Sequence, residues 1–394
     1  HAVTPTLVAD VPRQVIDLIG EGSLASQSKD GLRTEVTGDA IRLFGLSRAI
    51  EVASAGTFRH GPVEQAGDTP HRTIDARWTT SMRFSDEKGT LDAMGDVHAV
   101  SHAGTLERQE IDADIVAARI MPASEHERLV QDAKAGGLPV PERPLLFAEA
   151  RADPHLAGGG NESRVQASTY APTDPADAGR SSPNPAISRL FQAQGAVITA
   201  DNEKGIVEIP GPGRFVVVDL REEGEQGASA GQGPGSMRGR TLFEWSGTMR
   251  YDRLPGVVRL SDRALMVQRR LDGNVINVNA DELEARVTQA GETGSGVSLM
   301  TSDSAMELAG VSARRNVVVT ERTGSPLTLV REIQAEVLDY DTARGTAEAT
   351  SPEGGLVTLF ETARGVPVSA RSIFWDLAND RIEIRGMTSI TAPR

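Results

Sequence analysis

Apolar and polar residues alternate along much of the chain, but the alternation slips by one residue at repeated points. In residues 111–120, Ile111 and Ala113 keep a period of two, and the pattern resumes one position late at Val116. Alternation of this kind indicates a strand with one buried face. One inserted residue, as in a β-bulge or a corner, keeps the apolar side inward after the slip. The segment is therefore predicted to be a strand that bends sharply.

The same slip recurs along the sequence. It occurs again in 278–287, 333–340 and 368–377, and in looser form in 36–43 and 165–170. The bends are expected near Asp114, Asp281, Glu336 and Arg371. Glycine turns separate these segments, and helical periodicity is almost absent. The spacing predicts an almost entirely antiparallel β-protein built of stacked layers.

One phrase occurs twice, as "RWTTSMRFSD" at 77–86 and "EWSGTMRYD" at 244–252. The offset that matches Trp78 with Trp245 holds as far as 111–120 against 278–287, so we interpret it as an internal repeat. Residues 31–120 and about 190–287 are expected to form equivalent layers. Within the phrase, packing of the tryptophan and methionine in the interior is favoured over a specific ligand contact, with the arginine facing water.

A single helix is predicted within "SEHERLVQDAKAGG" (124–137), near residues 125–135. Ser124 and Glu127 form a capping-box pattern, and Gly136 is placed as the C-terminal stop. The proline-rich stretch 137–144 is predicted to connect the repeats, and the glycine-rich stretch 222–239 to form a long loop.

Composition excludes several classes of partner and site. The net charge of −14 argues against nucleic acid and against electrostatic docking on anionic lipid. The apolar runs are too short to span a membrane. The absence of cysteine rules out disulfides and thiolate metal sites. Because the chain begins at His1, we expect a processed or trimmed fragment from which any export signal has been removed.

The sequence gives little support to any candidate catalytic or metal-binding residue. "GASAG" around Ser229 matches the nucleophile-elbow pattern, but it lies in a glycine-rich stretch with no helix after it. His98 and His102 could begin a metal site, yet solvated surface is the favoured interpretation. Asp112 and Asp114 are two apart; Asp114 sits at a bend, where an aspartate can bond backbone groups that a bulge leaves unpaired. No catalytic residue, metal or cofactor is predicted, and the chain is not expected to be an enzyme.

The segments "QAEVLDYDTARGTAEATSPEG" (334–354) and "RLFQAQGAVITADNEKGIVEIPGPG" (189–213) resemble the OstA-like, or LptA-like, family of lipopolysaccharide-transport proteins. The resemblance implies a stacked antiparallel β-jellyroll solenoid of V-shaped layers (a β-taco). It also implies lipid acyl chains in an apolar cleft and modules that join end to end. The implied division is a first repeat unit at 1–122, a helix and linker at 123–144, a second unit at 145–290 and C-terminal layers at 291–394.

Two functional classes stay open. The favoured one is a non-enzymatic periplasmic carrier or bridge for a lipopolysaccharide-like glycolipid or other amphiphile in the envelope of a diderm bacterium, with head-to-tail association with itself or with other envelope jellyroll proteins. The other is a structural or adhesive β-solenoid without a lipid ligand; a polysaccharide-cleaving β-helix is disfavoured. The residues predicted to line the cleft are Trp78, Ile111, Val116, Trp245, Val278, Leu283, Ile333, Leu338, Ile373 and Trp375.

Overall fold

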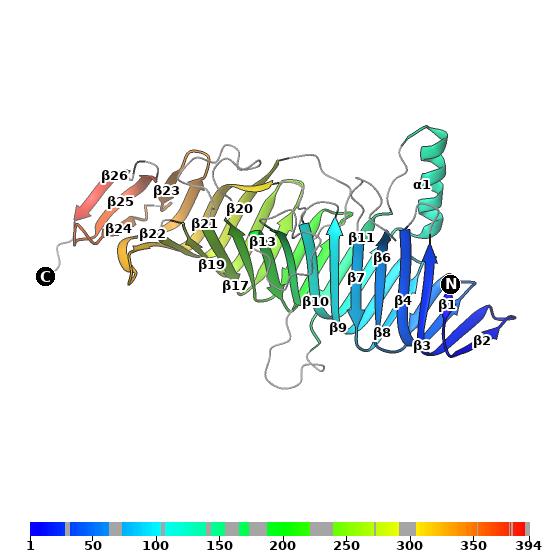
Figure 1. Ribbon diagram of the computed structural model, residues 1–394. Helices are drawn as coiled ribbons and strands as arrows, with labels where there is room; N and C mark the ends of the chain where they lie inside the picture. Colours follow the sequence, from blue (N-terminus) through cyan, green and yellow to red (C-terminus); the bar gives the residue numbers. More distant parts are fainter. Residues whose placement is uncertain are drawn as a thin grey trace. The chain divides into compact units, whose positions relative to one another are not determined.

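In the computed structural model the described residues are almost entirely β, with 72% of them in strands and one helix among them. Figure 1 shows the strands and this helix. The structure describes residues 1–27, 32–62, 73–103, 107–138, 143–153, 165–172, 187–220, 239–271, 273–290, 305–352, 354–377, 379 and 381–390. The strand pairs resolved in register among these residues are antiparallel. The expectation of an antiparallel β-protein with one short helix is confirmed.

The chain forms two compact units, and each is described by itself. Unit 1 comprises the described residues within 1–185 and 194–206, and unit 2 those within 186–193, 207–293 and 302–394. Unit 1 contains β1 (Ala2–Val3), β2 (Thr6–Asp10), β3 (Val15–Gln27), β4 (Leu32–Phe44), β5 (Ala49–Val52), β6 (Gly56–Pro62), β7 (Thr73–Trp78), β8 (Ser81–Ser85), β9 (Thr90–Ala103), β10 (Glu107–Ile120), α1 (Ala123–Ala135), β11 (Leu145–Arg151), β12 (Val165–Pro172) and β14 (Val197–Asp201). Most of β13 (Ile187–Gly195) and of β15 (Ile206–Pro210) belongs to unit 2, which continues with β16 (Gly213–Asp219), β17 (Gly239–Trp245), β18 (Thr248–Asp252), β19 (Val257–Arg269), β20 (Val275–Ala290), β21 (Ala305–Thr323), β22 (Thr328–Asp341), β23 (Thr346–Thr350), β24 (Val357–Glu361), β25 (Val368–Asp376) and β26 (Arg381–Ile390).

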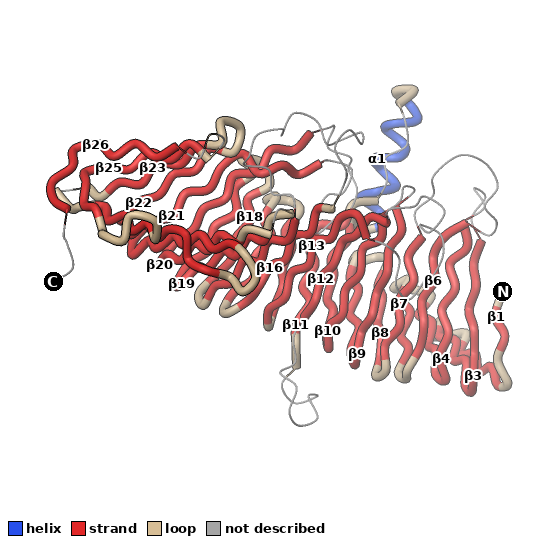
Figure 2. The backbone as a smooth tube through the Cα atoms, turned by 60° about the vertical axis from the view of Figure 1, so that its left-hand side comes forward, coloured by secondary structure: helices blue, strands red, loops and turns tan. Residues whose placement is uncertain are grey.

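The long strands bend, and most of them change partner at the bend. One half of β4 pairs with β6 and the other half with β5. In the same way β10 pairs with β12 and then β11, and β22 pairs with β24 and then β23. Each unit therefore has two half-sheets that share the long strands. In unit 1 we call the half-sheet with β5 and β8 half-sheet A and the half-sheet with β6 and β7 half-sheet B. In unit 2 the same names are used for the half-sheets with β18 and β23 and with β17 and β24, respectively. Figure 2 shows the strands in red and helix α1 in blue.

All four bends predicted from the sequence are confirmed. Register is interrupted around Asp114 in β10 and around Asp281 in β20. In β22, Glu336 lies between the halves that pair with β24 and β23. In β25, Arg371 separates the half that pairs with β24 from the half that pairs with β23. The slip in the alternation is therefore a reliable mark of a bend in this chain.

Each bent strand pairs with a second strand whose own bend contains residues with positive φ, the left-handed region of backbone space. The strands β3, β9, β19, β21 and β26 carry them, and each pairs with a strand bent at one of the positions above or, for β3, at Asp39. The residues with positive φ are Gly20, Gly95, Asp96, Asp262, Arg263, Arg315, Asn316 and Gly386. Only glycine adopts this conformation without steric cost, and asparagine and aspartate tolerate it better than most.

The internal repeat is visible in strand pairing. In unit 1, β7 and β8 both pair with β9, which pairs with β10. In unit 2, β17 and β18 both pair with β19, which pairs with β20. Trp78 faces Gly56 across one pair and Trp245 faces Gly213 across the other. The two tryptophans therefore occupy equivalent positions, while the three-part division of the chain stays a prediction.

Helix α1 lies where the sequence predicted it, but its start differs. Pro122 is the N-cap residue and no side chain caps the helix, so the proposed capping box of Ser124 and Glu127 is wrong. Glu127 instead pairs with Arg48 at 3.1 Å. At the other end Gly136 is the C-cap, as predicted, and Gly137 follows with a φ of 66°.

Candidate functional site

The inward residues of half-sheet A in unit 2 line up in register as a row of apolar side chains. Each residue of this row pairs with the next across adjacent strands, and all are between 0% and 5% exposed. The row, here called the deep row, consists of Met249, Leu260, Leu283, Ala313, Leu338, Ala349 and Ile373. Three predicted cleft residues, Leu283, Leu338 and Ile373, thus lie side by side in one row.

Farther from the bend, the next inward row of the same half-sheet carries the aromatic residues. It consists of Tyr251, Val258, Ala285, Val311, Tyr340, Ala347 and Trp375, and we call it the aromatic row. The predicted cleft residue Trp375 belongs to it and is 5% exposed. Burial raises the pKa of Tyr340 to about 12, opposed by the nearby charge of Arg270. A tyrosine held this way stays neutral at physiological pH.

Half-sheet B of unit 2 contributes a second buried apolar row. Its members are Phe243, Met266, Val278, Val319, Ile333, Leu359 and Val368. Val278 and Ile333, both predicted cleft residues, are 3% and 2% exposed. Trp245 lies two residues beyond Phe243 on the same inward face and is 3% exposed. The predicted residues of unit 2 are thus all inward and almost fully buried.

Unit 1 contains the same kind of apolar rows, and the first member of its deep row is exposed to solvent. Its deep row in half-sheet A consists of Leu7, Leu18, Ile41, Val52, Met82, Ala93, Val116, Ala150 and Ile198. Leu18 is 1% exposed, whereas Leu7, the first member, is 57% exposed. The predicted residue Val116 packs against the core cluster of this unit. Ile111 lies in the corresponding row of half-sheet B, between Ala99 and Ala167, and is partly buried.

The repeated tryptophans are packing residues with one fixed hydrogen bond each. Trp78 Nε1 donates to the carbonyl oxygen of Ser54 at 2.9 Å, and Trp245 Nε1 donates to that of Gly211 at 3.0 Å. Both side chains are 3% exposed, while Arg83 and Arg250 of the same phrase are exposed. The expectation that tryptophan and methionine pack inward and the arginine faces water is confirmed.

A polar row, which sequence reasoning missed, lies inward on half-sheet B of unit 2, farther from the bend than the apolar row. It consists of Thr241, Gln268, Ile276, Glu321, Arg331 and Glu361. Thr241 is 0% exposed and Arg331 is 7% exposed. Arg331 Nε lies 3.1 Å from Glu321 Oε2, and its guanidinium carbon lies 4.6 Å from the ring centre of Trp375 on half-sheet A. The ion pair and the aromatic row therefore meet across the two half-sheets.

The corresponding row of unit 1 is also largely polar. It runs through Ser26, Thr34, His60, Ile74, Ser101, Gln109 and Thr169. The Thr34 hydroxyl and His60 Nδ1 are 2.8 Å apart, and burial lowers the pKa of His60. The sequence does contain a signal for this row, since each of these polar residues falls at a position whose side chain points inward in the alternation of its strand. Without the register, however, a single polar residue at a strand end does not stand out.

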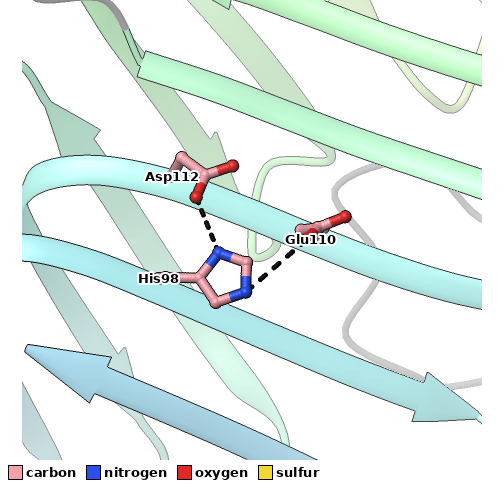
Figure 3. A group of neighbouring side chains, drawn as sticks. All are labelled: His98, Glu110 and Asp112. Carbon is pink, nitrogen blue, oxygen red and sulfur yellow. Dashed lines mark hydrogen bonds and ion pairs between the residues drawn. The ribbon is translucent and has the colours of Figure 1, made fainter. Parts of the chain in front are cut away.

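His98 lies in a polar group on the outer side of β9 and β10 (Figure 3). Its Nδ1 is 2.6 Å from Asp112 Oδ1 and its Nε2 is 3.6 Å from Glu110 Oε1. These three residues are close enough to share an ion, but Arg108 already pairs with Glu110 at 3.0 Å. The His98 side chain is 22% exposed, so it is partly buried on the outer surface rather than freely solvated. His102 lies outside this group, and burial, followed by the charge of Arg108, lowers its pKa.

The bend aspartates make structural contacts as expected, but of the two only Asp114 bonds a backbone group. Asp114 Oδ2 accepts a hydrogen bond from the backbone N–H of Asp153 at 2.7 Å. Asp281 Oδ2 accepts one from the side chain of Asn316 at 2.9 Å. The carboxylates thus tie bends to neighbouring segments. Ser229, the weak nucleophile candidate, lies outside the described residues.

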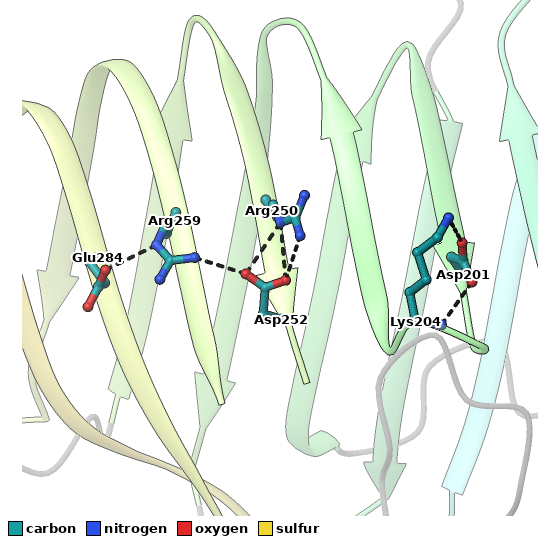
Figure 4. Close-up of polar contacts among 6 residues, drawn as sticks. All are labelled: Asp201, Lys204, Arg250, Asp252, Arg259 and Glu284. Carbon is teal, nitrogen blue, oxygen red and sulfur yellow. Dashed lines mark hydrogen bonds and ion pairs between the residues drawn. The ribbon is translucent and has the colours of Figure 1, made fainter. Parts of the chain in front are cut away.

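Charged side chains form a ladder on the outer face of unit 2 (Figure 4). Asp252 pairs with Arg250 at 3.0 Å and with Arg259 at 2.9 Å, and Arg259 also reaches Glu284 at 3.1 Å. The hydrogen bond that Arg250 donates to Asp252 raises the pKa of Arg250. In unit 1, a hydrogen bond from Lys204 lowers the pKa of Asp201. These exposed ion pairs stabilise strand pairing modestly and form no enclosed site.

No family model matches the chain, and no curated protein matches it in sequence. Part of it resembles a transport protein. The solved structure is LptH of Pseudomonas aeruginosa, the LptA-homologous periplasmic component of the conserved lipopolysaccharide transport device. The similarity covers 39% of this chain and 89% of that chain, at 9% identity and a TM-score of 0.27. A similarity of this size fixes neither the fold family nor the function. No helix among the described residues is long and apolar enough to cross a membrane.

Proposed function

We propose that this chain is a non-enzymatic carrier or bridge for an amphiphile in the envelope of a diderm bacterium, built as a stacked β-jellyroll. The observation that carries the proposal is the exposed end of the deep row in unit 1. Leu7 continues a row whose next member, Leu18, is 1% exposed, yet Leu7 itself is 57% exposed. An apolar stripe that reaches solvent at the end of a β-stack offers a surface to an acyl chain or to another apolar stripe.

The strands at this end support the proposal. β1 and β2 pair with β3, and the register of the described residues gives neither of them a second partner. Stacked repeat proteins ordinarily close their ends with polar caps, because an open end exposes apolar side chains and unpaired backbone groups. Here Val3, Leu7, Val8 and Val11 are all at least 50% exposed. An end of this kind favours association with a like module.

The apolar rows supply the free energy that a carrier needs. Burying apolar surface is worth roughly 25 cal/mol per Å², so an acyl chain laid along such a row gains several kcal/mol without directional contacts. A ligand held this way can slide from one strand to the next and pass to a partner, because each position offers a similar apolar environment. A glycolipid or other amphiphile with long acyl chains fits this chemistry.

A second function is favoured by one observation. In unit 2 the deep row is already between 0% and 5% exposed, so its side chains are packed without a ligand. This packing fits a structural or adhesive β-solenoid. The carrier proposal therefore requires the half-sheets of unit 2 to separate when an acyl chain enters.

Extraction of bound lipid tests the proposal. The purified protein, offered lipid A and phospholipids, is extracted with organic solvent and analysed by mass spectrometry. We expect the wild type and Leu254→Asp to carry amphiphile and Leu338→Asp to carry none. Leu254 is 92% exposed and lies outside the rows, so it is the matched control. Circular dichroism must show that both variants are folded, because a buried charge also destabilises. A wild type without amphiphile would leave the structural solenoid as the function.

A further inference from the structure

We infer that the polar row of unit 2, together with Trp375, recognises the headgroup of the amphiphile, and that this headgroup is uncharged and rich in hydroxyl groups. This inference rests on the proposed carrier function and goes beyond it by assigning residues and a headgroup class. Three observations carry it: the place of the row, its unsatisfied polar atoms and its charge balance.

The place of the polar row matches the shape of an amphiphile. Along half-sheet B the inward residues nearest the bend are apolar, and the polar residues come one row farther out. Thr241 follows Phe243 in this direction, and Arg331 follows Ile333. A ligand whose acyl chains lie along the apolar rows therefore places its polar end against part of the polar row, at Thr241 and Gln268 or, farther along, at Arg331.

Two buried polar atoms, one at the β17 end of the polar row and one beside Arg331 four strands away, have no partner in the described part of the chain. They are Thr241 Oγ1, in a residue that is 0% exposed, and Trp375 Nε1, in a residue that is 5% exposed. Buried donors and acceptors are nearly always satisfied, because an unmade hydrogen bond costs the full desolvation of the group. The equivalent atoms of Trp78 and Trp245 are satisfied by carbonyl oxygens. The indole N–H of Trp375 is thus a donor that a bound headgroup can use.

Charge balance indicates the class of headgroup. The guanidinium of Arg331 is neutralised by Glu321 at 3.1 Å, and Glu361 of the same row pairs with Arg364. A phosphate requires uncompensated positive charge, which this pairing does not leave. A sugar-like headgroup instead uses mixed donors and acceptors, here a hydroxyl, an amide, a carboxylate and an indole N–H. The ring of Trp375, 4.6 Å from Arg331, supplies an apolar face beside them.

Binding in this region requires the half-sheets to part where Arg331 covers Trp375. That contact joins β22 of half-sheet B to β25 of half-sheet A. A headgroup that enters takes the place of the guanidinium on the ring. The Arg331–Trp375 contact is thus the closed state of the row, and its loss accompanies binding.

Two surfactants with the same alkyl chain test the inference: dodecyl maltoside and dodecylphosphocholine, each titrated calorimetrically below its micelle concentration. We expect the wild type to bind the maltoside more tightly. Thr241→Val, which keeps the shape of the side chain and removes its hydroxyl, should weaken maltoside binding about fivefold and leave phosphocholine binding unchanged. Because the buried hydroxyl has no partner, this variant should be at least as stable as the wild type in urea.

Two further variants sharpen the test. Thr358→Val changes a threonine on the outward phase of β24 and should leave both affinities unchanged. The double variant Arg331→Gln with Glu321→Gln removes both charges together and should also weaken the maltoside selectively. Equal affinity of the wild type for both surfactants, or unchanged maltoside binding in Thr241→Val, would overturn the headgroup assignment and leave the carrier proposal standing. If neither surfactant binds, the carrier proposal itself fails.

Discussion

At the scale of single residues, glycines opposite the repeated tryptophans allow the close approach of neighbouring strands. Gly56 pairs with Trp78, and a Cβ atom on Gly56 would overlap the indole ring and the carbonyl oxygen of Thr37. Its φ is not positive, so the requirement is one of space and not of backbone conformation. The same pairing of glycine and tryptophan occurs at Gly213 and Trp245.

Gly56→Ala should therefore destabilise the protein by about 1–3 kcal/mol, the usual cost of overpacking a core. The measurement is urea unfolding followed by tryptophan fluorescence. Gly136→Ala at the end of α1 is the control, since a Cβ there has its nearest neighbour at 3.5 Å. Equal stability of the two variants would mean that the strands around Trp78 can shift apart at no cost.

At the scale of elements, each bend joins a strand that contains residues with positive φ to a paired strand whose bend was predicted from the sequence. One strand of each pair contributes residues with positive φ, such as Asp262 and Arg263 in β19 with φ of 59° and 55°. The paired strand contributes the bend residue recognised from the sequence, such as Asp281 in β20. An arginine in the left-handed region costs about 1 kcal/mol or more, because its Cβ crowds the backbone.

Arg263→Gly should consequently leave the protein as stable as the wild type or about 1 kcal/mol more stable. Arg269→Gly, at an exposed position in the regular part of β19, should lose about 0.5–1 kcal/mol. The comparison is made from urea midpoints at equal slope. A larger loss for Arg263→Gly than for Arg269→Gly would show that the bend depends on the arginine side chain and not on backbone strain.

The sequence predicted one strand of each bend and overlooked the other. Ile111, Ala113 and Val116 reveal the slip in β10 because their apolar phase changes on either side of Asp114. The left-handed residues of β19 and β21 leave no such mark, because Asp262, Arg263, Arg315 and Asn316 are polar residues that fit any exposed position. Helix α1 was predicted from the capping pattern of Ser124 and Glu127 and from Gly136; the helix is present, but its N-cap is Pro122 and Glu127 pairs with Arg48.

The residues of the candidate site were likewise predicted in part and missed in part. Apolar residues such as Leu283 and Leu338 were recognised because burial follows from their chemistry and phase. Their meeting in one row depends on strand register, which a single sequence does not specify. The polar row was missed because Thr241, Gln268 and Arg331 lie on different strands, and each alone resembles an ordinary strand-end residue. Glu110 was missed beside His98 for the same reason.

At the scale of the whole molecule, the exposed end of the deep row predicts self-association. Leu7 is 57% exposed, and the edge strand that carries it pairs with β3 alone among the described residues. We expect the mass of the wild type in sedimentation velocity to rise with protein concentration and that of Leu7→Asp to stay monomeric. Leu254→Asp, in the turn before β19, should behave as the wild type. A wild type that stays monomeric throughout would show that this end needs no copy of itself.

The pairing of bent strands constrains how such a chain can change its length. A strand with left-handed bend residues stands next to a strand without them in β3 and β4, β9 and β10, β19 and β20, and β21 and β22. Inserting one long strand would place two strands of the same kind together and reverse the direction of every later strand in the antiparallel sheet. Duplication of two strands at once preserves the order. Homologues of different length should therefore differ by even numbers of long strands, and gene segments that encode such pairs are the natural units of recombination.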